Sequence, residues 1–495
     1  MVFFKFRLTG GVFIIALIAL TPDIHAQKAE KLITPTSFYL EPGTYGTKRE
    51  THPPDYVRDF GLLNSNPKSW LKGLKLGLDY RVRAEMRHND IRRDAMVTDW
   101  PFLLRSRAYV GIHEGWGPFR WALELEDAHR VNGRFASDTR DFNRHELIQS
   151  YAELHFLNVL PKDRGGNQMP VFLRFGRQAF EMLDRRLIGL NRWRNTTNTF
   201  YGFRAALGGD HNAWHLDALL MNPIERSILS YDQPNYQQTF GAVIGHWRTL
   251  QPQMVFEPFV LWLDQRKSES QNLRARRIVS PGLRVYGKPQ NGAFHYELNG
   301  IVQFGEDGSL QHKAFAFMGE VGYAVKHWPH QPKLGLFYGF VSGDKSPNDQ
   351  ENNRFERFFG FARPWSADDY IIMENIQTLK FRVETKWKKG VRADAGYGFY
   401  WLASANDRFA NLLNGNGNRD LTGESGRFVG HGFDARVLFK PVGFVSANIG
   451  LALFSNGGFV QHRQEAVLGE SEAGSQFVYV ELMFNVLDVF QKKAP

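Results

Sequence analysis

Apolar and polar residues alternate along much of this chain, and the clearest run extends from Leu74 to Arg87. Leucine, tyrosine, valine, alanine and methionine occupy its even positions, while lysine, glycine, aspartate, glutamate and arginine occupy its odd positions. A period of two is typical of a β-strand whose two faces meet different surroundings. About ten such residues in a tilted strand can cross a bilayer as part of a closed barrel. We therefore expect an apolar face against lipid and a charged face around a water-filled lumen.

The same alternation recurs up to the C-terminus and predicts about eighteen strands, an even number as in bacterial outer-membrane barrels. The expected fold class is all-β: a closed antiparallel transmembrane β-barrel with long extracellular loops and short periplasmic turns. The alternative is a soluble sandwich of two packed sheets, for which one domain with so many strands would be large. The predicted strands are centred near Tyr80, Ala108, Leu123, Ala152, Leu173, Phe203, Leu216, Val243, Leu261, Leu283, Leu298, Met318, Leu336, Phe381, Ala395, Ala435, Ile449 and Val480.

The lengths of the connections between these strands agree with a barrel. The turns expected on one side are short: 115–118, 208–212, 288–291, 388–390 and 441–443. The connections expected on the other side are long: 130–146, 181–199, 342–372, 405–426 and 456–475. This asymmetry is typical of outer-membrane barrels. The segment 158–170 is the exception, because it falls on the short side and yet is long.

The N-terminus indicates where such a barrel would be located. Lys5 and Arg7 precede an apolar run from Val12 to Leu20, and a small-residue exit follows at Ala26. This is the pattern of a secretory signal peptide, and the run is short for the alternative, a membrane-spanning helix. We expect the bacterial cell outer membrane as the destination. The chain then divides into a signal peptide (1–26), an extended N-terminal segment (27–69), the barrel (70–485) and a C-terminal tail (486–495).

The charge of the chain suggests the kind of partner. The 495 residues carry a formal net charge of +10 and contain no cysteine. A basic surplus favours an anionic partner, such as nucleic acid, lipopolysaccharide or an acidic solute. The positions of the positive charges decide which of these partners is expected. For an exported barrel we expect contact with outer-membrane lipid and lipopolysaccharide, and no nucleic acid. Without cysteine, any metal would need oxygen or imidazole ligands, and the sequence shows no spacing typical of a metal site. We expect no cofactor and no metal.

The polar positions that alternate with the apolar ones in each strand are rich in lysine and arginine. In a barrel these side chains would line the lumen. A ring of guanidinium groups can select carboxylate-bearing solutes, because arginine stays charged and binds carboxylate in a bidentate manner. The alternative for each arginine is a structural ion pair with an acid of the same parity, such as Asp79, Glu124 or Asp394. The candidate pore-lining residues on this parity are Lys75, Arg81, Arg83, Arg105, Arg107, Arg174, Arg382 and Arg392.

Four segments carry a resemblance to a known family. VFLRFGRQ at Val171–Gln178, RPWSADDY at Arg363–Tyr370, MENIQ at Met373–Gln377 and YWLASANDR at Tyr400–Arg408 resemble the alginate-export outer-membrane porins. The resemblance implies a monomeric barrel of eighteen strands, with an electropositive constriction through which a polyuronate leaves the cell. It also implies that Arg174, Arg177 and Arg354 belong to the basic pore lining. The family can carry a long periplasmic lid loop near the C-terminus, whereas here the corresponding turn is only 440–443.

We therefore expect a passive channel for an anionic polysaccharide, with periplasmic export proteins as possible partners. The alternative within transport is an uptake porin for small anionic or apolar solutes, since a passive pore carries flux either way. No enzyme is expected, because the chain lacks a Gly-x-Ser-x-Gly elbow, a phosphate-binding glycine loop and a His-Glu-x-x-His helix. The connection 342–372 is rich in aromatic residues, and we expect its aromatic part to fold inward and narrow the pore. The alternative is an external cap packed on neighbouring loops.

Overall fold

The computed structural model describes residues 36–40, 49–60, 73–269, 273–362, 364–388 and 390–490. The predicted signal peptide lies outside the described residues, as do most of the N-terminal segment and the end of the C-terminal tail. In the described part, eighteen long antiparallel strands form the sheet: β2 (Leu74–His88), β4 (Phe102–Ile112), β5 (Phe119–Val131), β6 (Asn143–Leu160), β7 (Met169–Gln178), β8 (Phe200–Leu207), β9 (Trp214–Glu225), β11 (Gln238–Leu250), β12 (Met254–Gln265), β13 (Arg276–Gly287), β14 (Phe294–Asp307), β15 (Leu310–Ala324), β16 (Lys333–Val341), β18 (Ile376–Lys388), β19 (Val391–Trp401), β20 (Phe428–Val442), β21 (Val445–Asn456) and β22 (Gly474–Asn485).

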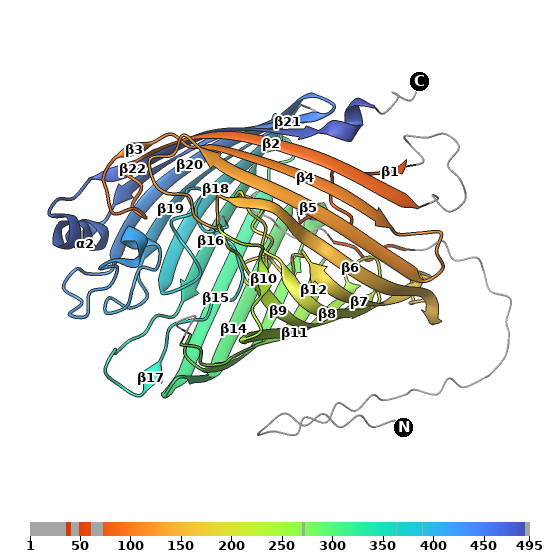
Figure 1. The fold of residues 1–495 in the computed structure, drawn as a ribbon, viewed down its shortest axis with the longest axis horizontal. Helices are drawn as coiled ribbons and strands as arrows, with labels where there is room; N and C mark the ends of the chain where they lie inside the picture. Colours follow the sequence, from red (N-terminus) through yellow and green to blue (C-terminus); the bar gives the residue numbers. More distant parts are fainter. Residues whose placement is uncertain are drawn as a thin grey trace.

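These strands pair in chain order and close into a barrel (Figure 1). The closing pair is β22 with β2, where Leu482 lies opposite Val82 and Asn485 lies opposite Asp79. Each of the eighteen predicted strand centres falls in a different strand of the barrel. The predicted fold class is therefore confirmed, with antiparallel pairing throughout the ring.

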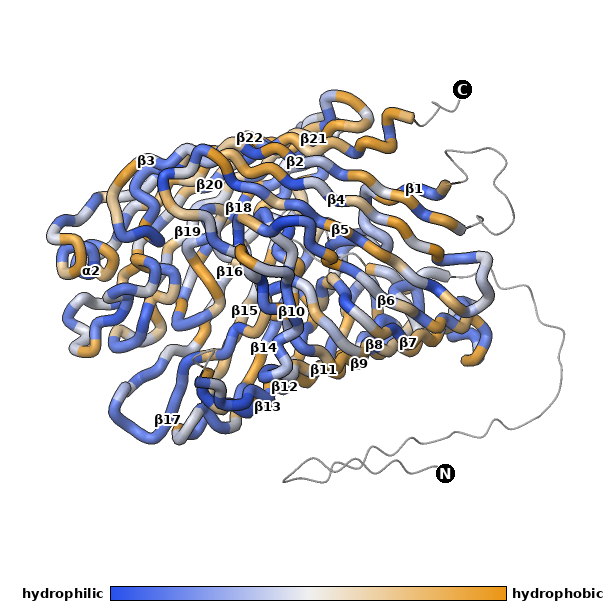
Figure 2. The backbone as a smooth tube through the Cα atoms, in the orientation of Figure 1, coloured by the Kyte–Doolittle hydropathy of each residue, from blue (hydrophilic) through white to orange (hydrophobic). Residues whose placement is uncertain are grey.

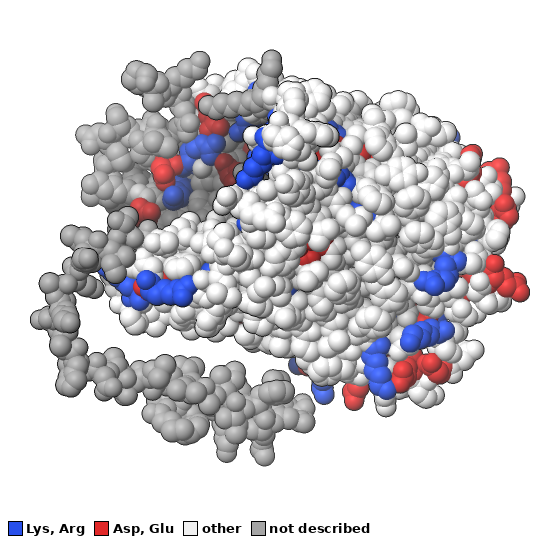
Figure 3. Space-filling view, turned by 180° about the vertical axis from the view of Figure 1, so that it is seen from behind, with Lys and Arg blue, Asp and Glu red and all other residues white. Residues whose placement is uncertain are grey.

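The barrel wall has two distinct faces, as the alternation predicts. In β2, the side chains of Leu78 and Tyr80 are 37% and 39% exposed, whereas Arg81 and Arg83 point inward and are 1% and 2% exposed. Figure 2 shows hydrophobic and hydrophilic residues following one another along the strands. Figure 3 shows the middle of this outer wall almost free of charged residues, which gather toward the ends. In the residues that the structure describes, no helix is long and apolar enough to cross a membrane.

The connections are short at one end of the barrel and mostly long at the other. Residues 113–118, 208–213, 251–253, 288–293 and 443–444 form short turns, whereas 132–142, 179–199, 342–375, 402–427 and 457–473 form long connections. The exception expected at 158–170 is smaller than predicted, because β6 continues to Leu160 and leaves only 161–168. One connection on the long side, 308–309 between β14 and β15, is a tight hairpin.

Several short elements are not part of the ring of eighteen long strands. The helix α2 (Gly458–Leu468) lies in the last long connection and buries Phe459 and Val460. The remaining elements are the two-residue and three-residue strands β1 (Val57–Asp59), β3 (Thr98–Asp99), β10 (Gln233–Pro234) and β17 (Glu351–Asn352), and the 3-10 turns η2 (Gln290–Gly292), η3 (Leu412–Gly415) and η4 (Val486–Val489).

Two long connections fold into the barrel, and we call them the first inward segment (179–199) and the second inward segment (342–375). Leu187 of the first segment and Phe355 and Trp365 of the second are at most 1% exposed and belong to one hydrophobic cluster with wall residues such as Phe240 and Phe337. The Trp365 ring meets the Phe337 ring edge-on at 5.5 Å. The prediction that the aromatic part of 342–372 folds inward is confirmed. Burial of this many aromatic rings provides the driving force.

The N-terminal segment also reaches into the barrel. The hydroxyl of Tyr56 donates to Glu124 Oε1 on the wall at 2.5 Å, and Arg107 lies over the Tyr56 ring at 4.7 Å. β1 pairs with β2 just beyond the end of β22, with Val57 opposite Gly77. We call residues 49–57 the N-terminal strap. It enters where the closing strands end, so part of the segment predicted as extended lies inside the lumen.

Candidate functional site

Most of the predicted pore-lining cations lie on the inner face and are paired with carboxylates of neighbouring strands. Eight of the ten make ion pairs, namely Lys75 with Asp59 (3.0 Å), Arg81 with Glu481 (3.7 Å), Arg83 with Glu85 (2.8 Å), Arg107 with Asp79 (3.1 Å), Arg174 with Glu153 (2.6 Å), Arg177 with Glu146 (2.6 Å), Arg382 with Asp394 (3.0 Å) and, between two connections, Arg354 with Asp407. Such pairs leave little net charge on the wall and stiffen it. The structure thus shows structural ion pairs, which were the alternative to solute-binding arginines. A role of these residues in solute binding remains a prediction.

Arg81 and Arg83 face the lumen but are covered by the first inward segment. Arg81 donates to the carbonyl oxygens of Arg192 and Arg194 and to Asn195 Oδ1, each at 2.8 Å. Arg83 donates to the carbonyl oxygen of Trp193 at 2.5 Å and lies 4.0 Å from the centre of its ring. These two arginines therefore hold the segment against the wall rather than facing open solvent.

The last two candidates differ from the others. Arg105 is 2% exposed, and its Nε and Nη1 atoms make no hydrogen bond with any described residue. Arg392 lies half-buried near the start of β19. Eight of the ten candidates occupy inward-facing positions of the strands, as parity requires. Arg177 is three positions from Arg174 on β7 and so has the opposite parity, and Arg354 lies in the second inward segment. The ten do not converge on one site.

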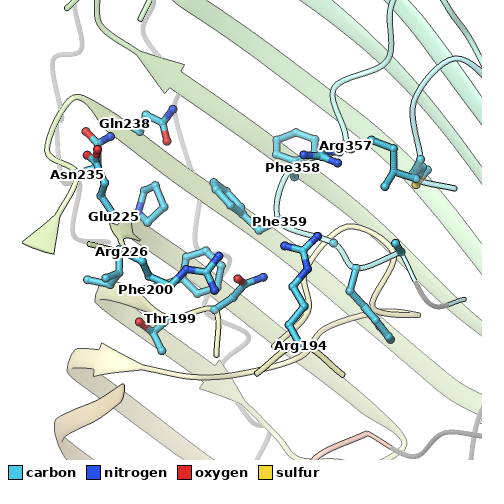
Figure 4. A pocket seen from close by; sticks show the side chains of 18 of the residues that line it. Arg194, Thr199, Phe200, Glu225, Arg226, Asn235, Gln238, Arg357, Phe358 and Phe359 are labelled. Carbon is cyan, nitrogen blue, oxygen red and sulfur yellow. The ribbon is translucent and has the colours of Figure 1, made fainter. Parts of the chain in front are cut away.

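A cavity of about 280 Å³ lies between the inward segments and the ends of β8, β9 and β11. Figure 4 shows Arg194 and Arg226 on one side of it and Arg357 with Phe358 on the other. The other lining residues are Arg186, Asn198, Thr199, Phe200, Pro223, Ile224, Glu225, Asn235, Gln238, Phe359, Gly360, Phe361, Ala362, Ile372 and Met373. Arginine and phenylalanine thus dominate its surface.

Three arginines of this cavity differ from those of the wall. No carboxylate of the described chain lies within 4.0 Å of the guanidinium group of Arg194, Arg226 or Arg357. Arg226 donates to the hydroxyl of Thr196 at 2.6 Å, and Arg357 is exposed. Burial and the positive charges of Arg140, Arg226 and Arg357 outweigh the negative charge of Asp369 and lower the pKa of Arg194 to about 9. At neutral pH these arginines remain cationic and repel one another, so an anion placed among them would be stabilised.

The chemistry of the cavity suits an anionic organic ligand. A guanidinium group presents paired N–H donors that match a carboxylate. The faces of Phe200, Phe358 and Phe359 offer an apolar surface for the carbon skeleton that bears the carboxylate. A volume of about 280 Å³ lies near the lower end of small-molecule sites. The cavity can thus bind a small organic acid or one unit of a longer chain.

The alternation of polar and apolar residues did not predict this site, because its arginines lie in connections. A two-residue alternation assigns side chains to a face only within a strand. Arg194 lies in the first inward segment, Arg226 follows β9, and Arg357 lies in the second inward segment. The one available signal was the interleaving of basic and aromatic residues in RFERFFGF, from Arg354 to Phe361. The prediction used Arg354 from this run, whereas the structure places Arg354 against Asp407 and Arg357 at the cavity.

Comparisons with known proteins agree with the barrel and its two faces. The sequence model of a family described as alginate export matches residues 72–473. Solved structures with a similar fold include two proteins of Pseudomonas aeruginosa, OccK8 (OprE), with 12% identity, a TM-score of 0.51 and coverage of 83% of this chain and 97% of that chain, and OccD3 (OpdP), with 10% identity, a TM-score of 0.51 and coverage of 83% and 90%. No curated protein gives a significant match.

Family and fold together indicate an outer-membrane channel and place the protein in the bacterial outer membrane. The family match extends over nearly all of the barrel, from the residues just before β2 to the connection before β22. The turn 443–444 lacks the long lid loop that the resemblance allows at that position. The match covers far more than half of the sequence, and the chain therefore belongs to the alginate export family.

Proposed function

We propose that this channel conducts a carboxylate-bearing polysaccharide, of the alginate-like polyuronate class, passively out of the cell. The observation that carries the proposal is the convergence of Arg194, Arg226 and Arg357 on one cavity with no carboxylate partner among the described residues. Cations without partners attract anions far more strongly than cations within ion pairs do. The recognition of the solute therefore lies in the connections at the long-loop end and not in the paired arginines of the wall.

The phenylalanine residues around these arginines support a saccharide over an inorganic anion. A uronate ring has an apolar face of C–H groups and a carboxylate at its edge. The cavity offers the matching arrangement, with Phe358 and Phe359 beside Arg357. An inorganic anion would gain nothing from these apolar surfaces.

A second function, the uptake of small anionic solutes, is favoured by a different observation. Both inward segments and the N-terminal strap occupy the lumen, and the cavity has about the volume of one small ligand. A polymer can pass only if these segments move aside, whereas a small acid needs less displacement. We keep this as the alternative, and it includes apolar acids because of the phenylalanine lining.

We further propose that a single barrel is the functional unit, surrounded by lipid and lipopolysaccharide. Periplasmic export proteins would meet the short-turn end, where the N-terminal strap enters beside β1.

The test is current through single channels in planar bilayers. We expect anion selectivity at low salt, and blockade by oligouronates but hardly by neutral oligosaccharides of equal length. Replacing Arg194, Arg226 and Arg357 together by glutamine should lower the affinity of the block at least tenfold. The proposed site is wrong if charged and neutral oligomers block the current equally. It is also wrong if oligouronates block the triple variant with the same affinity as the wild type. Block by monouronates but not by longer oligomers would favour uptake of small solutes.

A control must remove the same charge elsewhere. Replacing the exposed Arg144 and Arg277 and the half-buried Arg463 by glutamine also removes three positive charges, and none of these residues lines the cavity. We expect this variant to keep the affinity for oligouronates. If it loses the affinity to the same degree, the effect comes from overall charge and not from the cavity.

A further inference from the structure

Three residues with metal-binding side chains meet on the inner face near the short-turn end. His215 and Asp217 are two positions apart on β9, so their side chains share a face, and His246 lies directly opposite His215 on β11. Their ligand atoms all lie within 4.8 Å of one another, and all three side chains are buried. The rings of His215 and His246 stack with their centres 4.9 Å apart.

The two distances from the histidines to the carboxylate are compatible with a tetrahedral ion. Nε2 of His215 lies 3.1 Å and Nε2 of His246 lies 3.6 Å from Oδ2 of Asp217. Two ligand atoms at about 2.0–2.1 Å from a zinc ion and at the tetrahedral angle are about 3.3 Å apart. The two observed separations bracket this value.

The Nε2 atoms of the two histidines are left without hydrogen bonds among the described residues. Neither Nε2 atom makes a hydrogen bond with any residue in the described part of the chain, although His215 and His246 are only 8% and 5% exposed. The short distance from His215 to Asp217 therefore joins two groups that are close but not aligned as donor and acceptor. Buried polar atoms without partners are unusual and call for a ligand.

The surroundings of the cluster orient its ligand atoms as second-sphere residues do. Nδ1 of His246 is 2.8 Å from Oε1 of Glu257, and because a carboxylate only accepts, Nδ1 carries a hydrogen; in the neutral imidazole the lone pair is then on Nε2. Glu257 is held in turn by Arg284 at 2.6 Å. Arg204 donates to Oδ1 of Asp217 at 3.0 Å, which leaves Oδ2 for the cluster.

We propose that His215, His246 and Asp217 form a binding site for a divalent transition-metal ion, with zinc as the ion best matched by two imidazoles and one carboxylate. Three protein ligands leave the fourth position to water or to a carboxylate from the lumen. The ion links β9 and β11 near the turn 208–213, whose Asp210 side chain is 51% exposed and lies 3.8 Å from Nδ1 of His215. This proposal concerns a site apart from the arginine cavity and is independent of the transported solute.

Zinc binding to the full-length mature barrel in detergent micelles tests the proposal directly. After treatment with a chelator and dialysis against zinc chloride, we expect one zinc ion per barrel by elemental analysis. Titration calorimetry should show the affinity falling more than about 100-fold in His246→Ala, and by about 10- to 100-fold in Glu257→Gln, as expected for an outer-sphere change. Cobalt(II) in place of zinc should give the intense visible absorption of a tetrahedral ion.

The control is another buried histidine of the wall. His312 on β15 is 1% exposed and its Nε2 lies 3.2 Å from Gln303 Oε1, so His312→Ala makes a comparable change away from the cluster and should keep the zinc affinity. Should His246→Ala fail to fold, His246→Gln fills the space and is expected to lose the ion equally. Substoichiometric binding by the wild type, or equal affinities of the wild type and both His246 variants, would overturn the proposal.

Discussion

Arg81 holds the first inward segment inside the barrel, so replacing it should release that segment. Its guanidinium group makes three hydrogen bonds to the segment, to the carbonyl oxygens of Arg192 and Arg194 and to Asn195 Oδ1. In Arg81→Leu all three acceptors lose their donor at buried or partly buried positions, which favours their return to water. We therefore expect the segment to leave the wall and the pore to widen.

The size of the effect follows from these contacts. A hydrogen bond from a charged donor contributes about 1.5–3 kcal/mol. The three bonds share one guanidinium and are not additive, so we take about 3 kcal/mol for the set. That corresponds to a shift of roughly 150-fold in the equilibrium between the inward and released segment. Arg81→Lys keeps the charge but cannot reach three acceptors at once, and should have a smaller effect.

Single-channel conductance and hydrogen exchange of residues 190–197 together measure this release. We expect higher conductance and faster exchange in Arg81→Leu. Arg120→Leu is the control, because Arg120 lies on the same wall and pairs with Glu153 at 3.7 Å rather than with the inward segment. Unchanged exchange in Arg81→Leu would show that the hydrophobic cluster alone holds the segment, and the reasoning from hydrogen bonds would be refuted.

Three further predictions concern the strap, the wall and pH. Deleting the N-terminal strap (49–57) should raise conductance, because it removes the contact of Tyr56 with the wall; equal conductance with and without the strap would leave it no role in narrowing the pore. Val82→Arg places a charge on the lipid-facing side and should destabilise the barrel by about 2–4 kcal/mol in urea titrations in vesicles, whereas Val82→Leu should not. Burial and the charge of Glu297 raise the pKa of Asp184 to about 6, above its value in an unfolded chain. The protonated form is thus favoured in the inward segment, whose stability should fall as the pH rises from about 4 through 6, and Asp184→Asn should abolish that change in hydrogen exchange.

The strand β2 shows how much of the fold the sequence alone could predict. The alternation from Leu74 to Arg87 was enough to predict the strand, its lipid-facing side and its inward arginines, because the side chains of a strand alternate between its faces whatever its neighbours are. The same local rule located all eighteen strands, and the unequal connections indicated which end carries the loops. The inward fold of the aromatic connection also followed, since so many aromatic residues are unfavourable in water.

Local patterns could not decide what the inward side chains meet. Arg81 faces inward as predicted, but its partners come from a connection more than a hundred residues away, and only the path of that connection through the lumen brings them there. The cavity of Arg194, Arg226 and Arg357 is assembled from three connections with no periodicity. His215 and Asp217 share a face because they are two residues apart on one strand. His246 lies opposite His215 only because of the register between β9 and β11. Long-range register and loop packing decided these sites, because contacts between distant segments depend on the closed barrel and not on local sequence.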